Sequence, residues 1–159
     1  MKNRVHLTLV IITAVILVGV WLTAADTAKG SKGGYYDMVE NFFTSIQAGD
    51  YGGAVDQLYA NNPWISAKSD EIQQLRSQFL GLPDLVGAYK GHAKIWEVGI
   101  DGKFVYLNYL VAMERQPLSF KFHFYLVDNQ YRIHSFAYND DIEELLEEKA
   151  RQKFYSSTI

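Results

Sequence analysis

The stretch SFKFHFYLVDNQYRIHSFAY, residues 119–138, decides the fold, because it reads as two β-strands joined by a tight turn. Polar and apolar side chains alternate along 119–127 and again along 130–138, as they do in a strand with two different faces. The Asp-Asn-Gln run between them suits a two-residue turn. The sequence therefore predicts an antiparallel hairpin with His123 and His134 on adjacent strands.

A second hairpin is predicted directly upstream. The hydrophobic period is again two in this region, and the dipeptide Asp101-Gly102 divides it into runs over 89–100 and 103–113. Asp-Gly between two alternating runs is a strong signal for a tight hairpin turn. The intervening residues 114–118 contain a proline and are predicted to form a loop between the hairpins.

Segments with helical periodicity precede and follow the four predicted strands. Apolar side chains recur at helical spacing over 35–48, 54–59 and 69–82, and Pro83 is expected to end the third helix. After the strands, Asp140 begins the run DDIEELLEEKARQKF, which has acids at its start and bases near its end, as a helix favours. Three helices on one face of a four-stranded antiparallel sheet, with a further helix at the C-terminus, make an α+β domain.

Composition limits the possible functions. The chain has 159 residues and a net charge of −3, which fits one small domain. It contains no cysteine, which excludes disulfides, thiol catalysis, cysteine-ligated zinc and a lipid anchor on cysteine. Nucleic-acid binding is not expected either, because the sequence has no run rich in lysine and arginine.

The N-terminal segment is predicted to direct the chain out of the cytoplasm. Two basic residues precede an apolar run over 5–25, which is about 30 Å long as a helix and can span a bilayer. Residues 1–25 are therefore a transmembrane anchor, or else a signal peptide cleaved near Ala25. The glycine-rich residues 26–34 read as a linker. We expect a single-pass protein of the cell membrane with its domain outside the cytoplasm, or a secreted or periplasmic domain after cleavage.

Two short motifs carry a family resemblance. Gly-Asp-Tyr at 49–51 joins the first two helices, and Tyr-Arg-Ile-His-Ser-Phe at 131–136 closes the last hairpin. With the order of elements, they make residues 35–139 resemble the nuclear transport factor 2-like (cystatin-like, SnoaL-like) superfamily. The resemblance implies a curved sheet that wraps around the helices as a cone, often with a pocket inside. The C-terminal helix and tail, 140–159, depart from the family layout and could cover the pocket mouth or bind a partner.

Known activities of this superfamily transfer only where residues match. Members similar to ketosteroid isomerase need a carboxylate base and an acid or tyrosine donor in an apolar pocket. The strand residues assigned to the cone interior include no aspartate. Other members are non-catalytic binding or assembly domains, among them membrane-anchored periplasmic scaffold subunits of type IV secretion systems. The fold alone does not choose between these possibilities.

Pairing of Ile100 with Lys103 across the first turn assigns the strand side chains to the two faces of the sheet. One face is expected to point into the cone and to line a pocket for a small apolar ligand if the cone is open. The alternative is that aromatic side chains fill the interior. The candidate pocket residues are His92, Lys94, Trp96, Tyr109, Phe122, Phe124 and Ser135.

The opposite face carries more large apolar groups than a solvated surface needs, and we interpret it as a protein interface, most simply that of a symmetric dimer. His123 and His134 make a poor metal pair there, because neighbouring Lys121 and Arg132 add positive charge. No metal or cofactor is expected. The candidate interface residues are Ile95, Phe104, Tyr106, His123, Tyr125, His134, Phe136 and Tyr138.

Two functions are compatible with these patterns. The first is an exported, membrane-tethered, non-catalytic binding or assembly domain, and we favour it. The second is a small cyclase- or isomerase-like enzyme whose site lies inside the cone. An open pocket with polar groups at its mouth indicates the enzyme, whereas a filled interior indicates the binding domain.

Overall fold

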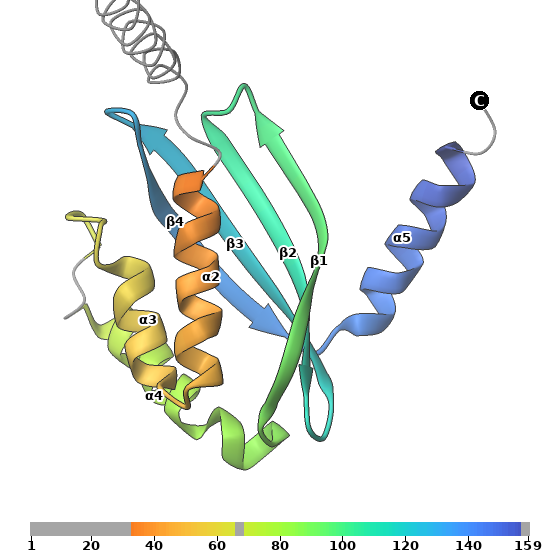
Figure 1. Ribbon diagram of the computed structural model, residues 1–159. Helices are drawn as coiled ribbons and strands as arrows, with labels where there is room; N and C mark the ends of the chain where they lie inside the picture. Colours follow the sequence, from red (N-terminus) through yellow and green to blue (C-terminus); the bar gives the residue numbers. More distant parts are fainter. Residues whose placement is uncertain (1–32, 66–68, 157–159) are drawn as a thin grey trace, which may run out of the picture.

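The computed structural model describes residues 33–65 and 69–156 (Figure 1). In this part of the chain three helices precede an antiparallel sheet of four strands in the order β1-β2-β3-β4, and a fourth helix follows it. This confirms the α+β class predicted from the sequence. The elements are α2 (Gly33–Gln47), α3 (Tyr51–Tyr59), α4 (Asp70–Val86), β1 (Tyr89–Ile100), β2 (Phe104–Met113), β3 (Pro117–Val127), β4 (Gln130–Asn139) and α5 (Ile142–Ser156).

Residues with positive φ make both hairpin turns. The turn between β3 and β4 consists of Asp128 (φ 50°) and Asn129 (φ 59°), a left-handed conformation that Asp and Asn tolerate and that suits a tight hairpin. The turn between β1 and β2 is one residue longer than predicted. Ile100 pairs with Phe104 there, and the predicted pairing with Lys103 was wrong.

An aromatic core joins the first three helices to one face of the sheet, which we call the inner face. Figure 1 shows α2, α3 and α4 together on this side. Phe42 of α2 is fully buried, and its ring centroid lies 5.8 Å from that of Phe79, 5.3 Å from that of Phe122 and 5.2 Å from that of Phe136. Removing such rings from water, at about 25 cal/mol per Å² of apolar surface, is the main stabilising term of the domain.

A β-bulge in β1 changes the faces that strict alternation predicted. Ile95 is an extra residue, because Lys94 and Trp96 pair with two residues of β2 that are adjacent in sequence. Trp96, predicted to line the pocket, therefore lies on the outer face of the sheet. Glu97, predicted to point outward, lies on the inner face opposite a buried position of β2.

A second bulge has the same effect in β4. His134 is the extra residue, because Ile133 and Ser135 pair with adjacent residues of β3. Ser135, predicted to line the pocket, lies on the outer face. Phe136 and Tyr138, predicted to belong to the interface, lie on the inner face, and their rings contact the aromatic core. These face assignments from the sequence were wrong because alternation cannot count an inserted residue.

Two prolines occur inside elements rather than at the predicted breaks. Helix α4 continues through Pro83 to Val86, and the prediction that it ends at this proline was wrong. Only the last turn is affected: the Pro83 carbonyl accepts a hydrogen bond from the N–H of Gly87 at 2.9 Å, and Gly87 ends the helix with φ 82°. Pro117 begins β3, a position where a strand tolerates proline, so the predicted loop 114–118 is shorter than expected.

The predictions for residues 1–25 lie outside the described residues, as does most of the predicted linker 26–34. Helix α2 begins at Gly33, two residues earlier than the helical pattern predicted. Over 33–65 and 69–156, no helix is both long enough and apolar enough to cross a membrane.

Candidate functional site

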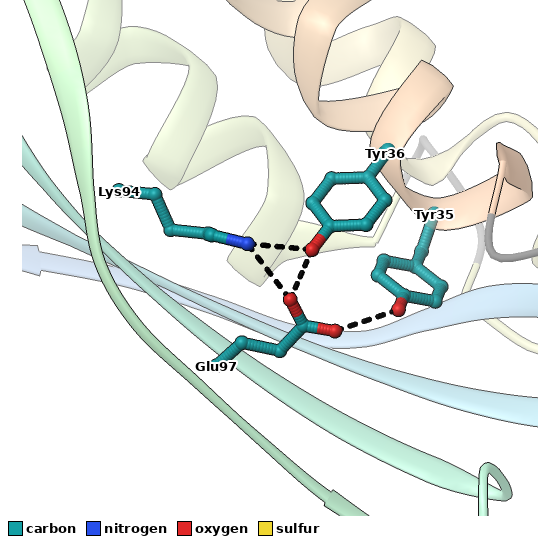
Figure 2. Close-up of polar contacts among 4 residues, drawn as sticks. All are labelled: Tyr35, Tyr36, Lys94 and Glu97. Carbon is teal, nitrogen blue, oxygen red and sulfur yellow. Dashed lines mark hydrogen bonds and ion pairs between the residues drawn. The ribbon is translucent and has the colours of Figure 1, made fainter.

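Polar side chains gather where the start of α2 faces the edge strand β1. Tyr35 and Tyr36 belong to the first turns of α2, and the bulge at Ile95 places Lys94 and Glu97 together on the inner face of β1. We call Tyr35, Tyr36, Lys94 and Glu97 the Glu97 cluster (Figure 2). It joins the helix to a strand that follows about 60 residues later in the chain.

Hydrogen bonds occupy both carboxylate oxygens of Glu97. Tyr35 donates its hydroxyl hydrogen to Oε1 at 2.8 Å, and Tyr36 donates its own to Oε2. The Lys94 ammonium donates to the same Oε2 at 2.8 Å and to the Tyr36 hydroxyl oxygen at 2.6 Å. Figure 2 shows the three partners converging on the carboxylate. One ammonium and two hydroxyl groups therefore replace the water that a free carboxylate would bind.

This network keeps Glu97 ionised. Partial burial by itself raises the pKa of the carboxyl group, but the hydrogen bonds from Lys94 and the two tyrosines outweigh it and hold the pKa of Glu97 at about 2. The hydrogen bond to Glu97, followed by the one to Tyr36, raises the pKa of Lys94. Burial and the hydrogen bond to Glu97 raise the pKa of the Tyr35 hydroxyl. At neutral pH the cluster therefore contains a carboxylate and an ammonium ion.

The geometry does not suit proton abstraction by Glu97. A general base needs a lone pair directed at its substrate and a pKa near the working pH. Here both carboxylate oxygens already accept hydrogen bonds, and the pKa lies far below neutrality. The cluster instead holds the start of α2 against the edge of the sheet.

Replacing Glu97 with glutamine is expected to remove an acid-sensitive part of the stability. The pKa of this group falls from 4.5 to about 2 on folding. Its contribution is therefore complete above about pH 4.5 and is lost as the pH falls toward about 2. Solvent screens this partly exposed pair, so we expect the free energy of unfolding to fall by about 1–2 kcal/mol at neutral pH.

Urea unfolding of the parent and the Glu97→Gln variant checks this expectation. The two midpoints should differ at neutral pH and should converge near the acid end of the range. A difference between the two urea midpoints that is equally large at neutral and at acidic pH would contradict the role assigned to the ionised carboxylate.

His92, a candidate pocket residue, packs as an aromatic ring between α2 and β1. Its ring stacks on Phe43 with centroids 3.7 Å apart, and its Nδ1 lies 2.5 Å from the hydroxyl of Tyr89. Its Nε2 lies 3.8 Å from a carboxylate oxygen of Glu40. Burial lowers the pKa of His92, and the charge of Glu40 opposes this only in part. The uncharged imidazole is thus favoured, and its contacts are those of a packing residue.

The other inner-face candidates lie in two different environments. The side chain of Lys94 is 40% exposed and belongs to the Glu97 cluster, whereas its cross-strand partner Tyr109 is 3% exposed. Burial, followed by the charge of Glu40, raises the pKa of Tyr109 to about 12. Phe122 and Phe124 are fully buried, and the Phe122 ring lies 5.9 Å from that of Tyr109. Packed aromatic rings thus occupy the region in which the candidate pocket residues were expected to surround a ligand.

The outer face of the sheet carries a second group of side chains. The ring of Tyr106 stacks on His123 with centroids 4.8 Å apart, and His123 also contacts the hydroxyl of Ser135 at 3.0 Å. The bulge residue His134 lies 5.8 Å from the ring of Phe104. These contacts extend a continuous aromatic surface across three strands. We call the following residues the outer-face patch: Phe104, Tyr106, Lys121, His123, Tyr125, Arg132 and His134.

The charge of the outer-face patch is positive. Burial, and then the charges of His134 and Lys121, lower the pKa of His123. Among the outward-facing strand residues of the described chain none is acidic, and Asp128 in the adjoining turn lies 3.9 Å from Arg132. Within the described residues no three histidine, aspartate or glutamate side chains are grouped as in a metal site. The patch therefore suits an anionic or acidic partner better than a cation.

Sequence reasoning did not find the Glu97 cluster. Residues 94 and 97 are three apart, and in a regular strand such residues lie on opposite faces. Only the bulge between Lys94 and Glu97 brings their side chains together. The pair Tyr35-Tyr36 was interpreted through helical periodicity alone, although two phenols at a helix start are suitable donors for a partly buried carboxylate.

Comparison with known proteins gives structural neighbours only. No protein-family model matches the chain, and neither does any curated protein. One similar solved structure is a "Putative NTF2-like transpeptidase" from Campylobacter jejuni, with 17% identity and a TM-score of 0.48 over 62% of this chain and 94% of that one. Another is an NTF-2 like protein of unknown function from Silicibacter pomeroyi DSS-3, with 14% identity and a TM-score of 0.43 over 67% of this chain and 92% of that one.

Proposed function

We propose that the chain is an exported, membrane-tethered, non-catalytic binding or assembly domain of the NTF2-like type, and that the outer-face patch is its contact surface. The contrast between the two faces of the sheet carries this proposal. On the inner face aromatic rings pack against one another, and Glu97 is fully hydrogen bonded. On the outer face aromatic and cationic side chains lie at or near the surface.

The composition of the outer-face patch supports a protein contact. Tyrosine, phenylalanine and arginine are enriched in the centres of protein interfaces, where all three supply a large contact area and tyrosine and arginine add a polar group. Val98 and Ile100, both exposed, extend the apolar area from the patch onto β1. The expected occupant is a protein partner or a second copy of the chain.

Export and membrane attachment rest on the sequence. Residues 1–25 combine two basic residues with an apolar run of membrane-spanning length, and the linker 26–34 would separate that run from the domain. The orientation follows the tendency of positive charge to remain in the cytoplasm. Cleavage near Ala25 would release the same domain as a secreted or periplasmic protein.

The alternative, a cyclase- or isomerase-like enzyme, has less support. The inner face does hold a carboxylate, Glu97, which the sequence analysis had placed outside. Its hydrogen bonds and its pKa of about 2 fit a structural ion better than a base. Tyr109 is buried beside Phe122, so its hydroxyl does not combine with Lys94 and His92 at an open pocket.

Site-specific photo-crosslinking of the full chain in cells tests the proposal. A photoreactive phenylalanine analogue at Tyr106, in the outer-face patch, is expected to give discrete protein adducts in the membrane fraction. The matched control position is Trp64, which is 81% exposed and follows α3 on the helical side of the domain. Trp64 should give no discrete adduct. Equal adducts at both positions, or adducts confined to the cytosolic fraction, would contradict the proposal.

A further inference from the structure

We propose that the outer-face patch binds helix α5 of a second copy of this chain, in a reciprocal two-fold pair. The inference rests on the proposed function and names the partner of that same surface. Figure 1 shows α5 on the side of the sheet opposite α2, α3 and α4, where it points away from the strands. Most of its side chains are exposed.

The charges of α5 and of the patch are complementary. The four glutamates within 143–148 are all exposed, and none forms an ion pair within the described part of the chain. The patch presents Lys121 and Arg132, and among the described carboxylates only Asp128, in the adjoining turn, pairs with either of them, at 3.9 Å from Arg132. Complementary charges of this kind steer two surfaces together and fix their relative position.

Apolar groups accompany these charges on both surfaces. Leu146 and Phe154 of α5 are exposed, and so are Val98 and Ile100 on the outer face of β1. A single exposed apolar side chain is ordinary on a protein surface. Here the apolar groups of α5 belong to the helix that carries the glutamates, and Val98 and Ile100 pair with Tyr106 and Phe104 of the cationic patch. Pairing the two surfaces would remove both apolar sets from water.

Within the described residues, the glutamates of helix α5 form no ion pair with Lys121 or Arg132 of their own patch. Leu145 is buried, and the Lys149 ammonium lies 5.8 Å from the centroid of the Trp96 ring, so the first half of α5 is held on its own sheet. There its glutamates line a hollow with Pro117 at the start of β3. Lys121 and His123 are further along the same strand, about 13 Å and about 20 Å from Pro117 at a rise of about 3.3 Å per residue.

A two-fold axis perpendicular to the strands brings the two surfaces together. When two outer faces pack across such an axis, the strands of the two copies run in opposite directions. The end of the sheet that carries α5 in one copy then lies over the end that carries the patch in the other. Each copy supplies one helix whose first half is acidic and receives one, so the same contact forms twice.

The lack of cysteine in the chain allows a clean test by disulfide cross-linking. Full-length Glu143→Cys and full-length Ile100→Cys, carrying different affinity tags, are co-expressed and oxidised in detergent. We expect a mixed disulfide between the two chains. The control replaces Ile100→Cys with Leu85→Cys, which places the thiol at an exposed position of α4, and the mixed disulfide should be lost.

Charge-reversal variants test whether the mixed disulfide forms through specific docking or through random collisions. Lys121→Glu in the Ile100→Cys chain should abolish most of the mixed disulfide, and Glu147→Lys in the Glu143→Cys chain should restore it. High salt should reduce the yield for the unreversed pair, because these charges lie at the surface. If neither charge reversal changes the yield of the mixed disulfide, the proposal is overturned.

Two further outcomes distinguish this inference from the proposed function. The double variant Glu143→Cys/Ile100→Cys tests whether α5 closes on its own sheet, and an intramolecular disulfide at high dilution would overturn the reciprocal pair. Absence of the mixed disulfide, together with an adduct from Tyr106 to a different protein, would also overturn it but would leave the proposed function intact. If neither the mixed disulfide nor the Tyr106 adduct forms, both the reciprocal pair and the proposed function are overturned.

Discussion

Replacing Phe42 with alanine is expected to lower the free energy of unfolding by about 3–5 kcal/mol. The ring is fully buried and contacts Phe79, Phe122 and Phe136, which come from α4, β3 and β4. The surrounding rings cannot close the resulting cavity, because each is held by other aromatic contacts. Small domains are stable by only about 5–15 kcal/mol, so this one change removes a large share of the total.

Urea unfolding followed by tryptophan fluorescence measures this loss. Phe154→Ala is the matched control, because it removes the same ring from an exposed position of α5. Its free energy of unfolding should change by less than about 0.5 kcal/mol. Similar losses for the two variants would show that the ring of Phe42 is not the centre of the core.

Inserting one alanine between Ser135 and Phe136 is expected to lower the free energy of unfolding by at least about 4 kcal/mol or to prevent folding. With the insertion, the end of β4 shifts by one position relative to the start of the strand. Phe136 and Tyr138 would then point outward, and the inserted alanine and Ala137 would take their places in the aromatic core. The domain would lose two rings from its interior.

The control for this insertion is His134→Ala, which keeps the length of β4. The His134 side chain is exposed, so its truncation should change the free energy of unfolding by less than about 0.5 kcal/mol. Circular dichroism and thermal unfolding of the two variants separate the effect of register from that of the side chain. An insertion variant as stable as His134→Ala would contradict the register described for β4.

Local patterns predicted most of the fold. The alternation of 119–138 and the Asp-Gly turn were enough to predict both hairpins, and helical spacing predicted four helices in the right order. These signals are local, since each depends on residues a few positions apart. Errors at Pro83 and Pro117 affected only element ends, where one missing hydrogen-bond donor matters little.

The faces of the sheet could be predicted only in part. Between the bulges, alternation assigned Tyr109, Phe122 and Phe124 to the inner face and Tyr106 and His123 to the outer one, as observed. Beyond each bulge every assignment was inverted. Ile95 and His134 are ordinary strand residues in composition, and the reason that they are inserted lies in packing across the sheet, which a single sequence does not display.

The same inversion explains why the candidate site was incomplete. Lys94 was correctly placed on the inner face, but its partner Glu97 was assigned to the opposite one. The two tyrosines that complete the network come from a helix about 60 residues earlier. Contacts of this separation depend on the docking angle of α2, and no local motif encodes that angle.

The irregularity of β1 has a consequence for solubility. An edge strand presents unpaired backbone groups to other molecules, and a long, flat edge invites addition of a foreign strand. β1 is 12 residues long and is one of the two edges of the sheet, yet its pairing register is interrupted after Tyr89 and again after Lys94. An incoming strand would meet a twisted and discontinuous row of donors and acceptors. The bulge that places Glu97 against α2 therefore also protects the domain from edge-to-edge aggregation.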